Sequence, residues 1–475
     1  MFSKFTSYLD FSDAAKYADV ARNIVLDLGK TSSFNFWGTT NSNWIQPITP
    51  YSISLFYKLF GVNDFAVMAT SFFYFLLSLL FVFLLAQKIY KDKLVSILST
   101  VAVGFNYNLI NYATSGATES PFIFEILVVT YFLSLKKRWG NILGIVFMVL
   151  MYFTRPQAII YIFGLLLYYF INNYSFKKGI IYTFTTFIVG TILYGLSSKQ
   201  GLIAVTQNLP GMAVSDSLRG STVDFSLIVL VKKVFYNLYN FYKAIPDIMN
   251  PYLFVLFGIG VIKKYSPFNI AISFMTGLTF LITALTIPFY RYIHPVVPLI
   301  YIVGVATLLE IFKESKFKIY ITSFLVLFFA LGQTLGVMFL DSRFDRKMKN
   351  TDKAPIYVDM SYKLKEITNK DMVIVTNLDT WGSWYGERKT IWFPLEPDMV
   401  LPVQESIDAI YLTSYKMDDE NYYMSEEWRK IFNNPKEQKI LPDFKFVGEY
   451  EFKAENNYDR ESGKAVLLVR DDKDK

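Results

Sequence analysis

The sequence contains no cysteine and a single histidine among its 475 residues. Without cysteine the chain has no disulfide framework, no thiol nucleophile and no sulfur ligand for a metal. It also lacks a phosphate loop of the form Gly-x4-Gly-Lys-Ser/Thr, a His-Glu-x-x-His motif and a nucleophile elbow. Any serine triad would have to use His294 as its base. These absences leave few of the familiar soluble-enzyme chemistries open.

Charge is scarce as well, because Asp, Glu, Lys and Arg make up 18% of the chain whereas hydrophobic residues make up 53%. This composition is typical of a polytopic membrane protein. From Asp341 to the end there are 22 Lys and Arg against 27 Asp and Glu, a net charge of −5. The whole chain carries +7, so the part before Asp341 carries +12. The basic residues stand in short clusters between apolar runs, a pattern of membrane orientation that argues against nucleic-acid binding.

Apolar runs long enough for a bilayer, or nearly so, recur along the chain before Asp341. Together they predict about ten transmembrane helices and no helical repeat. The runs cover 65–87, 94–113, 120–135, 141–154, 157–173, 179–197, 250–262, 267–288, 293–310 and 319–339.

Every second connection between these runs is basic, which predicts its location in the cytoplasm. The outer side then holds residues 1–64, the loop 198–249 and everything after Asp341. Within that loop, Phe225 to Tyr242 has the apolar spacing of an amphipathic helix on the membrane surface. Ten spans would place both ends outside, although the first twenty residues are polar and carry no export signal. We therefore expect that a first transmembrane helix, upstream of Met1, is missing.

We expect residues 341–475 to form a soluble extracytoplasmic α/β domain, separate from a transmembrane domain that covers residues 1–340. The segments 372–376, 390–393, 409–413 and 465–469 have the composition of short strands bounded by turn formers. The segments 355–367 and 425–433 predict helices, and the mixture favours an α/β class.

Charged residues beside apolar runs are costly and therefore informative. Asp13 has Lys16 and Tyr17 on the same predicted helical face, and it either caps that helix or serves a reaction. Glu119 precedes Pro121, so it is either a helix cap or a second functional carboxylate. Asp13 and Glu119 together could supply oxygen ligands to a divalent cation, although nothing in the sequence requires one.

Two basic segments complete the candidate site. Arg155, in Thr-Arg-Pro-Gln, offers a planar fork for phosphate oxygens, or it extends to a lipid headgroup. Arg291 lies three residues before His294, at the predicted outer end of a span, with Tyr292 between them. The histidine is either a structural hydrogen-bonding group or a participant in chemistry.

These pieces, in this order, resemble the GT-C superfamily of integral membrane glycosyltransferases, and in particular the branch of protein O-mannosyltransferases and lipid A aminoarabinose transferases. The resemblance rests on short motifs over most of the chain. Ala14 stands where family members often have a second acidic residue. The matching motifs are Asp13-Ala-Ala-Lys-Tyr-Ala-Asp-Val-Ala-Arg22, Gln46-Pro47 through Leu59-Phe-Gly61, Thr154-Arg-Pro-Gln157 and Arg291-Tyr through Pro298.

The resemblance implies transfer of a hexose or pentose from a polyprenyl or dolichyl monophosphate to a glycan, lipid or protein acceptor. It also implies a location in the cytoplasmic membrane and a role in building the cell envelope. Asp13 would be the general base of an inverting reaction, assisted by Glu119 and His294. The donor phosphate would be bound by Arg155, Arg291, Lys16 and Tyr292.

Three other readings compete with a transferase. A transporter or flippase would require polar residues at mid-bilayer and related halves, which the sequence does not show. A binding or assembly protein would need one or two spans rather than ten. A polymerase or ligase of lipid-linked glycans uses the same kind of donor, and the outer loop 198–249 is compatible with it.

Overall fold

The computed structural model describes residues 8–38, 45–197, 227–286, 288–340, 346, 349–415 and 425–471. The chain divides into two compact units. We call Ser71–Val214 with Val223–Leu340 the helical unit. We call Met1–Thr70, Ser215–Thr222 and Asp341–Lys475 the mixed unit. The N-terminal segment thus groups with the C-terminal residues and not with the apolar helices.

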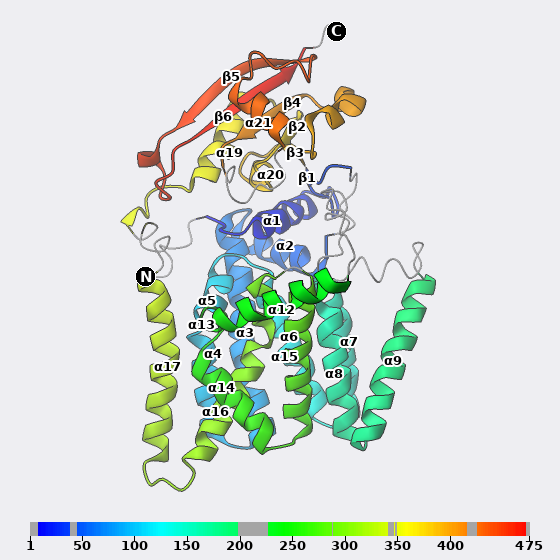
Figure 1. Cartoon of the computed structure of the whole chain (residues 1–475), viewed down its shortest axis with the longest axis vertical. Coiled ribbons are helices and arrows are strands. Elements are labelled where there is room, and N and C mark those ends of the chain that lie inside the picture. The colour runs from blue at the N-terminus through cyan, green and yellow to red at the C-terminus, as the bar shows by residue number, and fades with distance from the viewer. Residues whose placement is uncertain are drawn as a thin grey trace. The chain divides into compact units, whose positions relative to one another are not determined.

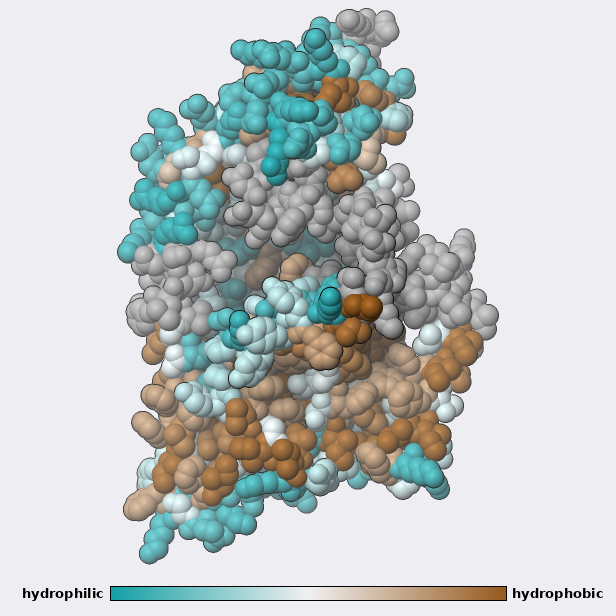
Figure 2. Space-filling model, viewed as in Figure 1, coloured by the Kyte–Doolittle hydropathy of each residue, from teal (hydrophilic) through white to brown (hydrophobic). Residues whose placement is uncertain are grey.

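The helical unit is a bundle of apolar helices running roughly side by side in Figure 1. Its visible face in Figure 2 is mostly hydrophobic, with hydrophilic side chains gathered at the lower end of the helices. Each predicted apolar run corresponds to a helix or a bent pair. The elements are α3 (Asp64–Tyr90, beginning in the mixed unit), α4 (Lys93–Gly104), α5 (Tyr107–Thr114), α6 (Glu119–Ser134), α7 (Arg138–Thr154), α8 (Ala158–Asn173), α9 (Phe176–Ser197), α12 (Leu227–Lys243), α13 (Ile245–Ile248), α14 (Pro251–Lys263), α15 (Pro267–Leu285), η3 (Tyr290–Tyr292), η4 (His294–Val296), α16 (Val297–Ile311) and α17 (Lys318–Leu340).

Length and composition qualify four of the described helical segments as membrane spans, namely Asp64–Tyr90, Pro267–Leu285, Tyr290–Ile311 and Lys318–Gly336. The run 94–113 is not one straight helix, since α4 and α5 meet at 62° and count as a fifth span only together. The helices α7, α8 and α14 are apolar but have 17 residues or fewer. The protein is therefore a multi-pass membrane protein, and the count of ten spans stays a prediction.

The predicted amphipathic helix is present as α12, which packs against α15. The Asn237 side chain donates to the Ala284 carbonyl at 2.8 Å, and Phe241 is buried. Phe235, Tyr239 and Tyr242 stay more than half exposed. The first part of the outer loop, 198–226, lies outside the described residues, and its last part contains α13.

A six-stranded sheet in the order β1-β3-β2-β4-β6-β5 forms the centre of the mixed unit. The first four strands in this order pair in parallel, and β6 and β5 join antiparallel at one edge. The four strands predicted from the sequence are present as β2, β3, β4 and β6, and the two predicted helices are present as α19 and α21. The elements are β1 (Phe34–Asn35), β2 (Val373–Thr376), β3 (Lys389–Trp392), β4 (Ala409–Thr413), β5 (Phe444–Phe452), β6 (Gly463–Arg470), α19 (Ile356–Ile367), α20 (Trp381–Trp384), α21 (Glu426–Asn433), η5 (Pro397–Ser406) and η6 (Ala454–Asn456).

Two N-terminal helices belong to this same unit. Helix α1 (Ser12–Val25) is buried on nearly all sides because its alanines allow α2 (Ile48–Phe60) and α20 to approach closely. Shortly after α1, the chain adds strand β1 to the sheet by pairing Phe34 with Thr390. The mixed unit is therefore assembled from segments near opposite ends of the sequence.

Candidate functional site

Asp13 lies in the first turn of α1 and is not its cap. The N-cap is Phe11, which makes no side-chain cap bond, so the capping alternative does not apply to Asp13. The Asp13 carboxylate forms an ion pair with the Lys16 ammonium at 3.1 Å. Its side chain is 28% exposed and that of Lys16 is 11% exposed. An acidic side chain at a helix N-terminus is favoured by the helix dipole, and Asp13 remains accessible to a reactant.

The ammonium of Lys16 lies beside the Tyr17 ring, 5.2 Å from its centroid. Burial is the largest single effect and lowers the pKa of Lys16, but interactions with Asp13, Tyr17 and Asp379 together raise this pKa above its ordinary value. Lys16 therefore keeps its charge at neutral pH. The helical spacing expected from the sequence, with these three residues on one face, is present.

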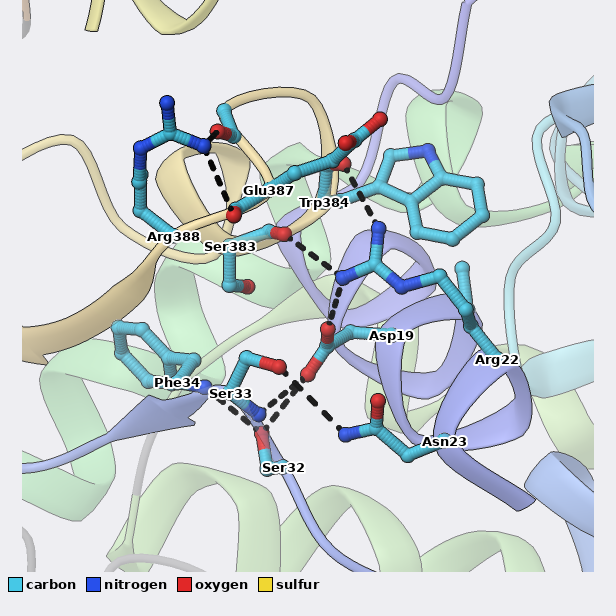
Figure 3. A network of polar contacts seen from close by, with 12 residues as sticks. Asp19, Arg22, Asn23, Ser32, Ser33, Phe34, Ser383, Trp384, Glu387 and Arg388 are labelled. Atoms are coloured by element: carbon cyan, nitrogen blue, oxygen red, sulfur yellow. Dashed lines mark hydrogen bonds and ion pairs between the residues drawn. The ribbon is translucent and has the colours of Figure 1, made fainter. Parts of the chain in front are cut away.

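The last part of the Asp13 motif has a structural role (Figure 3). Arg22 donates to the Asp19 carboxylate at 2.5 Å and to the backbone carbonyl oxygens of Ser383 and Trp384 at 2.9 and 3.3 Å. The other Asp19 oxygen accepts from the backbone N–H of Ser33 at 2.6 Å. Asp19 and Arg22 thus join α1 to α20 and to the segment before β1. Burial raises the pKa of Asp19, an effect that Arg22 and Ser33 oppose.

In the helical unit, Glu119 is the first residue of α6, whose N-cap is Thr118. Its carboxylate forms an ion pair with the Arg155 guanidinium, and both side chains are buried. Arg155 also donates to Gln157 Oε1 at 2.8 Å and to Thr118 Oγ1 at 3.2 Å. Glu119 is therefore not the cap of α6, and the burial of Arg155 argues against an extension toward lipid headgroups. The functional alternatives for both residues stay predictions.

Arg291 lies next to this ion pair. Its charge is near enough to Arg155 for the two guanidinium groups to repel each other. Both guanidinium groups are close to the Tyr292 ring, 5.9 Å from its centroid for Arg155 and 5.5 Å for Arg291. We call Glu119, Arg155, Arg291 and Tyr292 the arginine cluster. Three of the four residues expected to bind phosphate are thus brought together.

His294 is 4% exposed, and its Nδ1 is hydrogen-bonded to the Tyr112 hydroxyl. This contact is the structural role that the sequence left open for it. Its part in chemistry stays a prediction.

The predicted carboxylates are each paired with a basic side chain. Asp13 faces Lys16 in the mixed unit, and Glu119 faces Arg155 in the helical unit. Among the described residues no group of three or more His, Asp or Glu side chains gathers in the way a metal site requires. We therefore derive no step through a metal ion.

Two further acidic residues of the mixed unit were missed by sequence reasoning. Asp379 follows β2, and the neighbouring Thr380 hydroxyl donates to the Ser12 carbonyl oxygen at 2.6 Å. Asp64, at the start of α3, accepts from Trp384 Nε1 at 2.7 Å and from the Tyr385 hydroxyl at 2.9 Å. The only signal for Asp64 was a charge beside an apolar run. Nothing in the sequence pointed to Asp379, because its proximity to α1 depends on the fold.

Comparisons with known proteins agree with this architecture. Residues 46–198 match the model of the dolichyl-phosphate-mannose-protein mannosyltransferase family, a segment that includes Glu119 and Arg155. No curated protein sequence matches the chain.

Two solved structures share the fold over 98% of this chain and 95% of theirs. One is ArnT from Cupriavidus metallidurans bound to undecaprenyl phosphate, with a TM-score of 0.54 and 9% identity. The other is the same protein in the apo state, with a TM-score of 0.51 and 10% identity. The chain therefore has the fold of ArnT, and the family match and this fold together support a GT-C glycosyltransferase.

Proposed function

We propose that this protein moves a sugar from a polyprenyl- or dolichyl-phosphate carrier to an acceptor on the extracytoplasmic side, with inversion at the anomeric carbon. The observation that carries the proposal is the arginine cluster, with two guanidinium groups beside a single carboxylate. Paired arginines suit phosphate because their planar forks match its oxygens. Arg155 is buried, and a buried cation is costly unless an anion compensates it.

The charge of the cluster matches such a donor. Glu119 forms an ion pair with Arg155, and Arg291 carries a second positive charge in the same cluster. A sugar linked to a lipid phosphate is a phosphodiester with one negative charge. When the sugar leaves, a monoester remains with a charge of about −1.5 to −2 at pH 7. Arg155 can then exchange Glu119 for the phosphate, so the cluster stabilises the leaving group more than the substrate.

Asp13 supplies the base in this proposal. It takes the proton of the acceptor hydroxyl while the hydroxyl oxygen attacks the anomeric carbon. The bond from that carbon to the phosphate oxygen breaks, and the electron pair leaves with the polyprenyl phosphate. A general base of this kind contributes about 10²–10⁴-fold to the rate. Its partial exposure next to Lys16 is the observation that favours this role.

The phosphate-binding part is tested by the affinity of the purified full chain for undecaprenyl phosphate. Arg155→Gln and Arg291→Gln should each weaken binding about 10- to 100-fold, the size of one or two charge-assisted hydrogen bonds. Glu119→Gln should tighten it about tenfold, because it removes the competing carboxylate.

The matched control is Arg138→Gln, which changes the exposed arginine at the opposite end of α7. It should leave the affinity within about twofold of wild type. Equal affinity for Arg155→Gln, Arg291→Gln and Arg138→Gln would refute the assignment of the cluster.

A further inference from the structure

A second carboxyl group lies in α6, the helix that begins with Glu119. Glu125 falls within the apolar run 120–135 and is 3% exposed. Its Oε1 accepts a hydrogen bond at 2.7 Å from the hydroxyl of Thr154, the last residue of α7. Its Oε2 has no hydrogen-bond partner among the described residues. The carboxyl group is therefore buried inside the helical unit with one of its two oxygens unpaired.

This carboxyl group contributes little to the stability of the fold. An acidic side chain among apolar helices is costly, and a buried oxygen without a partner adds to that cost. Thr154 does not depend on Glu125 either, because its hydroxyl also lies 3.1 Å from the Leu150 carbonyl oxygen and can donate there. A leucine in place of Glu125 would fill the space without the polar cost. The presence of a carboxyl group at this position therefore calls for a functional reason.

The hydrogen bond from Thr154 ends next to the arginine cluster. Arg155 directly follows Thr154, is the C-cap of α7, and precedes Pro156. Its guanidinium is paired with Glu119 at the start of α6. Glu119 and Glu125 thus hold the end of α7 at two levels of α6, about 9 Å apart along the helix axis. One contact is made through the Arg155 side chain, and the other through the residue before it.

The opposite end of the hairpin of α6 and α7 is fixed by close packing. A Cβ atom added at Gly140 would lie 2.8 Å from the Phe132 carbonyl oxygen, and one at Gly144 would lie 2.8 Å from the Leu133 side chain. Small residues let two helices approach in this way. With that end fixed, the contact between α6 and Thr154 determines the point from which the Arg155 side chain extends.

We propose that Glu125 is a positioning residue for donor binding, which fixes the backbone at Arg155 through Thr154 while the arginine exchanges Glu119 for the donor phosphate. This inference rests on the proposed function. In the exchange the Arg155 side chain releases one of its partners, whereas the bond between Thr154 and Glu125 is unaffected. That bond needs only a carboxyl oxygen as acceptor, so both protonation states of Glu125 can form it. No proton passes through Glu125.

The test is the affinity of the purified full chain for undecaprenyl phosphate in Glu125→Leu and Glu125→Gln. Leu removes the acceptor and should weaken binding about 3- to 10-fold, the size of one hydrogen bond. Gln keeps an oxygen for Thr154 and should restore the affinity to within about twofold of wild type. The melting temperature of Glu125→Leu should be unchanged or higher, because a poorly paired buried polar group is lost. A wild-type affinity for Glu125→Leu would overturn the proposal, and so would a lower melting temperature, which a purely structural role predicts.

Thr154→Val tests the same contact from α7. It should weaken binding as much as Glu125→Leu does, and the double variant should bind no more weakly than either single variant. The matched control is Thr130→Val in α6. Thr130 is buried like Thr154, and its hydroxyl likewise donates to the carbonyl oxygen four residues earlier, that of Ile126, at 2.7 Å. Additive losses in the double variant, or equal losses for Thr130→Val and Thr154→Val, would refute the contact as the cause.

An Arg155→Gln background shows whether Glu125 acts through the arginine. There Glu125→Leu should change the affinity less than about twofold, because the side chain that it positions is gone. A full loss in that background would refute action through Arg155. If the wild type binds and Arg155→Gln binds more weakly, an unchanged affinity for Glu125→Leu refutes the role of Glu125 alone. A wild type that does not bind undecaprenyl phosphate would refute the proposed function as well.

Discussion

The contact between Arg22 and Asp19 gives the sharpest stability prediction. Asp19 is completely buried, and Arg22 is its only oppositely charged partner among the described contacts. Arg22 also binds two backbone carbonyls at α20 and stacks over the Trp384 ring, 5.1 Å from its centroid. Arg22→Met keeps much of the apolar stem but removes all of these polar contacts. It leaves a buried carboxylate without its counter-charge.

Breaking a buried ion pair from one side costs about 3–5 kcal/mol. We expect the lower end, about 3 kcal/mol, because Ser32 and Ser33 still donate to Asp19. For domains of about 150–250 residues, the class of the mixed unit, each kcal/mol lowers Tm by about 2–4 °C. Arg22→Met should therefore lower the melting temperature of the mixed unit by about 6–12 °C.

The assay is thermal unfolding of the purified full chain followed by tryptophan fluorescence. Lys430→Met is the control, because the pair of Lys430 with Glu427 is exposed and should contribute about 1–2 °C at most. Adding Asp19→Asn to Arg22→Met should recover part of the loss, since it removes the unpaired charge. A melting temperature for Arg22→Met within about 2 °C of the control would refute the reasoning.

Two other contacts in the mixed unit give further predictions. Burial, with repulsion from Asp459, raises the pKa of Asp359 from 3.8 to about 6, so the folded state binds this proton more tightly than the unfolded chain. This contribution to stability is present near pH 4 and lost as the pH rises through about 6, so Asp359→Asn should raise Tm above pH 6 and leave it unchanged near pH 4. Asp64→Asn can accept only one of the hydrogen bonds from Trp384 and Tyr385, and should cost about 1–2 kcal/mol, measured by denaturant unfolding. If Asp359→Asn and the wild type have the same Tm at every pH, the role of Asp359 is refuted. If Asp64→Asn unfolds at the same denaturant concentration as the wild type, the role of the Asp64 hydrogen bonds is refuted.

Local patterns in the sequence predicted most of the secondary structure. Apolar runs located the helices because a membrane helix must satisfy its backbone internally over a long hydrophobic stretch. The break between α4 and α5 was not predicted, although Asn106, whose side chain caps α5, stands at this position in the sequence. Strand β1 was missed because so short a strand carries no periodic signal, and it forms only by pairing with β3.

The arginine cluster was predictable because Arg155 and Arg291 are cations beside apolar runs, where a charge requires a reason. The surroundings of Asp13 were harder to predict from the sequence. The sequence assigned Arg22 to the same motif as Asp13, whereas the fold uses it to hold α20. Asp379 is far from Asp13 in the sequence, and only the docking of α1 against the loop after β2 brings them together.

The central claim is that Asp13 is the base of a sugar transfer from a lipid phosphate. The most direct measurement compares the full chain with Asp13→Asn for transfer of radiolabelled sugar from undecaprenyl-phosphate donors in membranes, at equal amounts of folded protein. We predict transfer by the wild type and a loss of at least about 100-fold in the variant, the lower range for a general base. Equal transfer by both proteins would contradict the account.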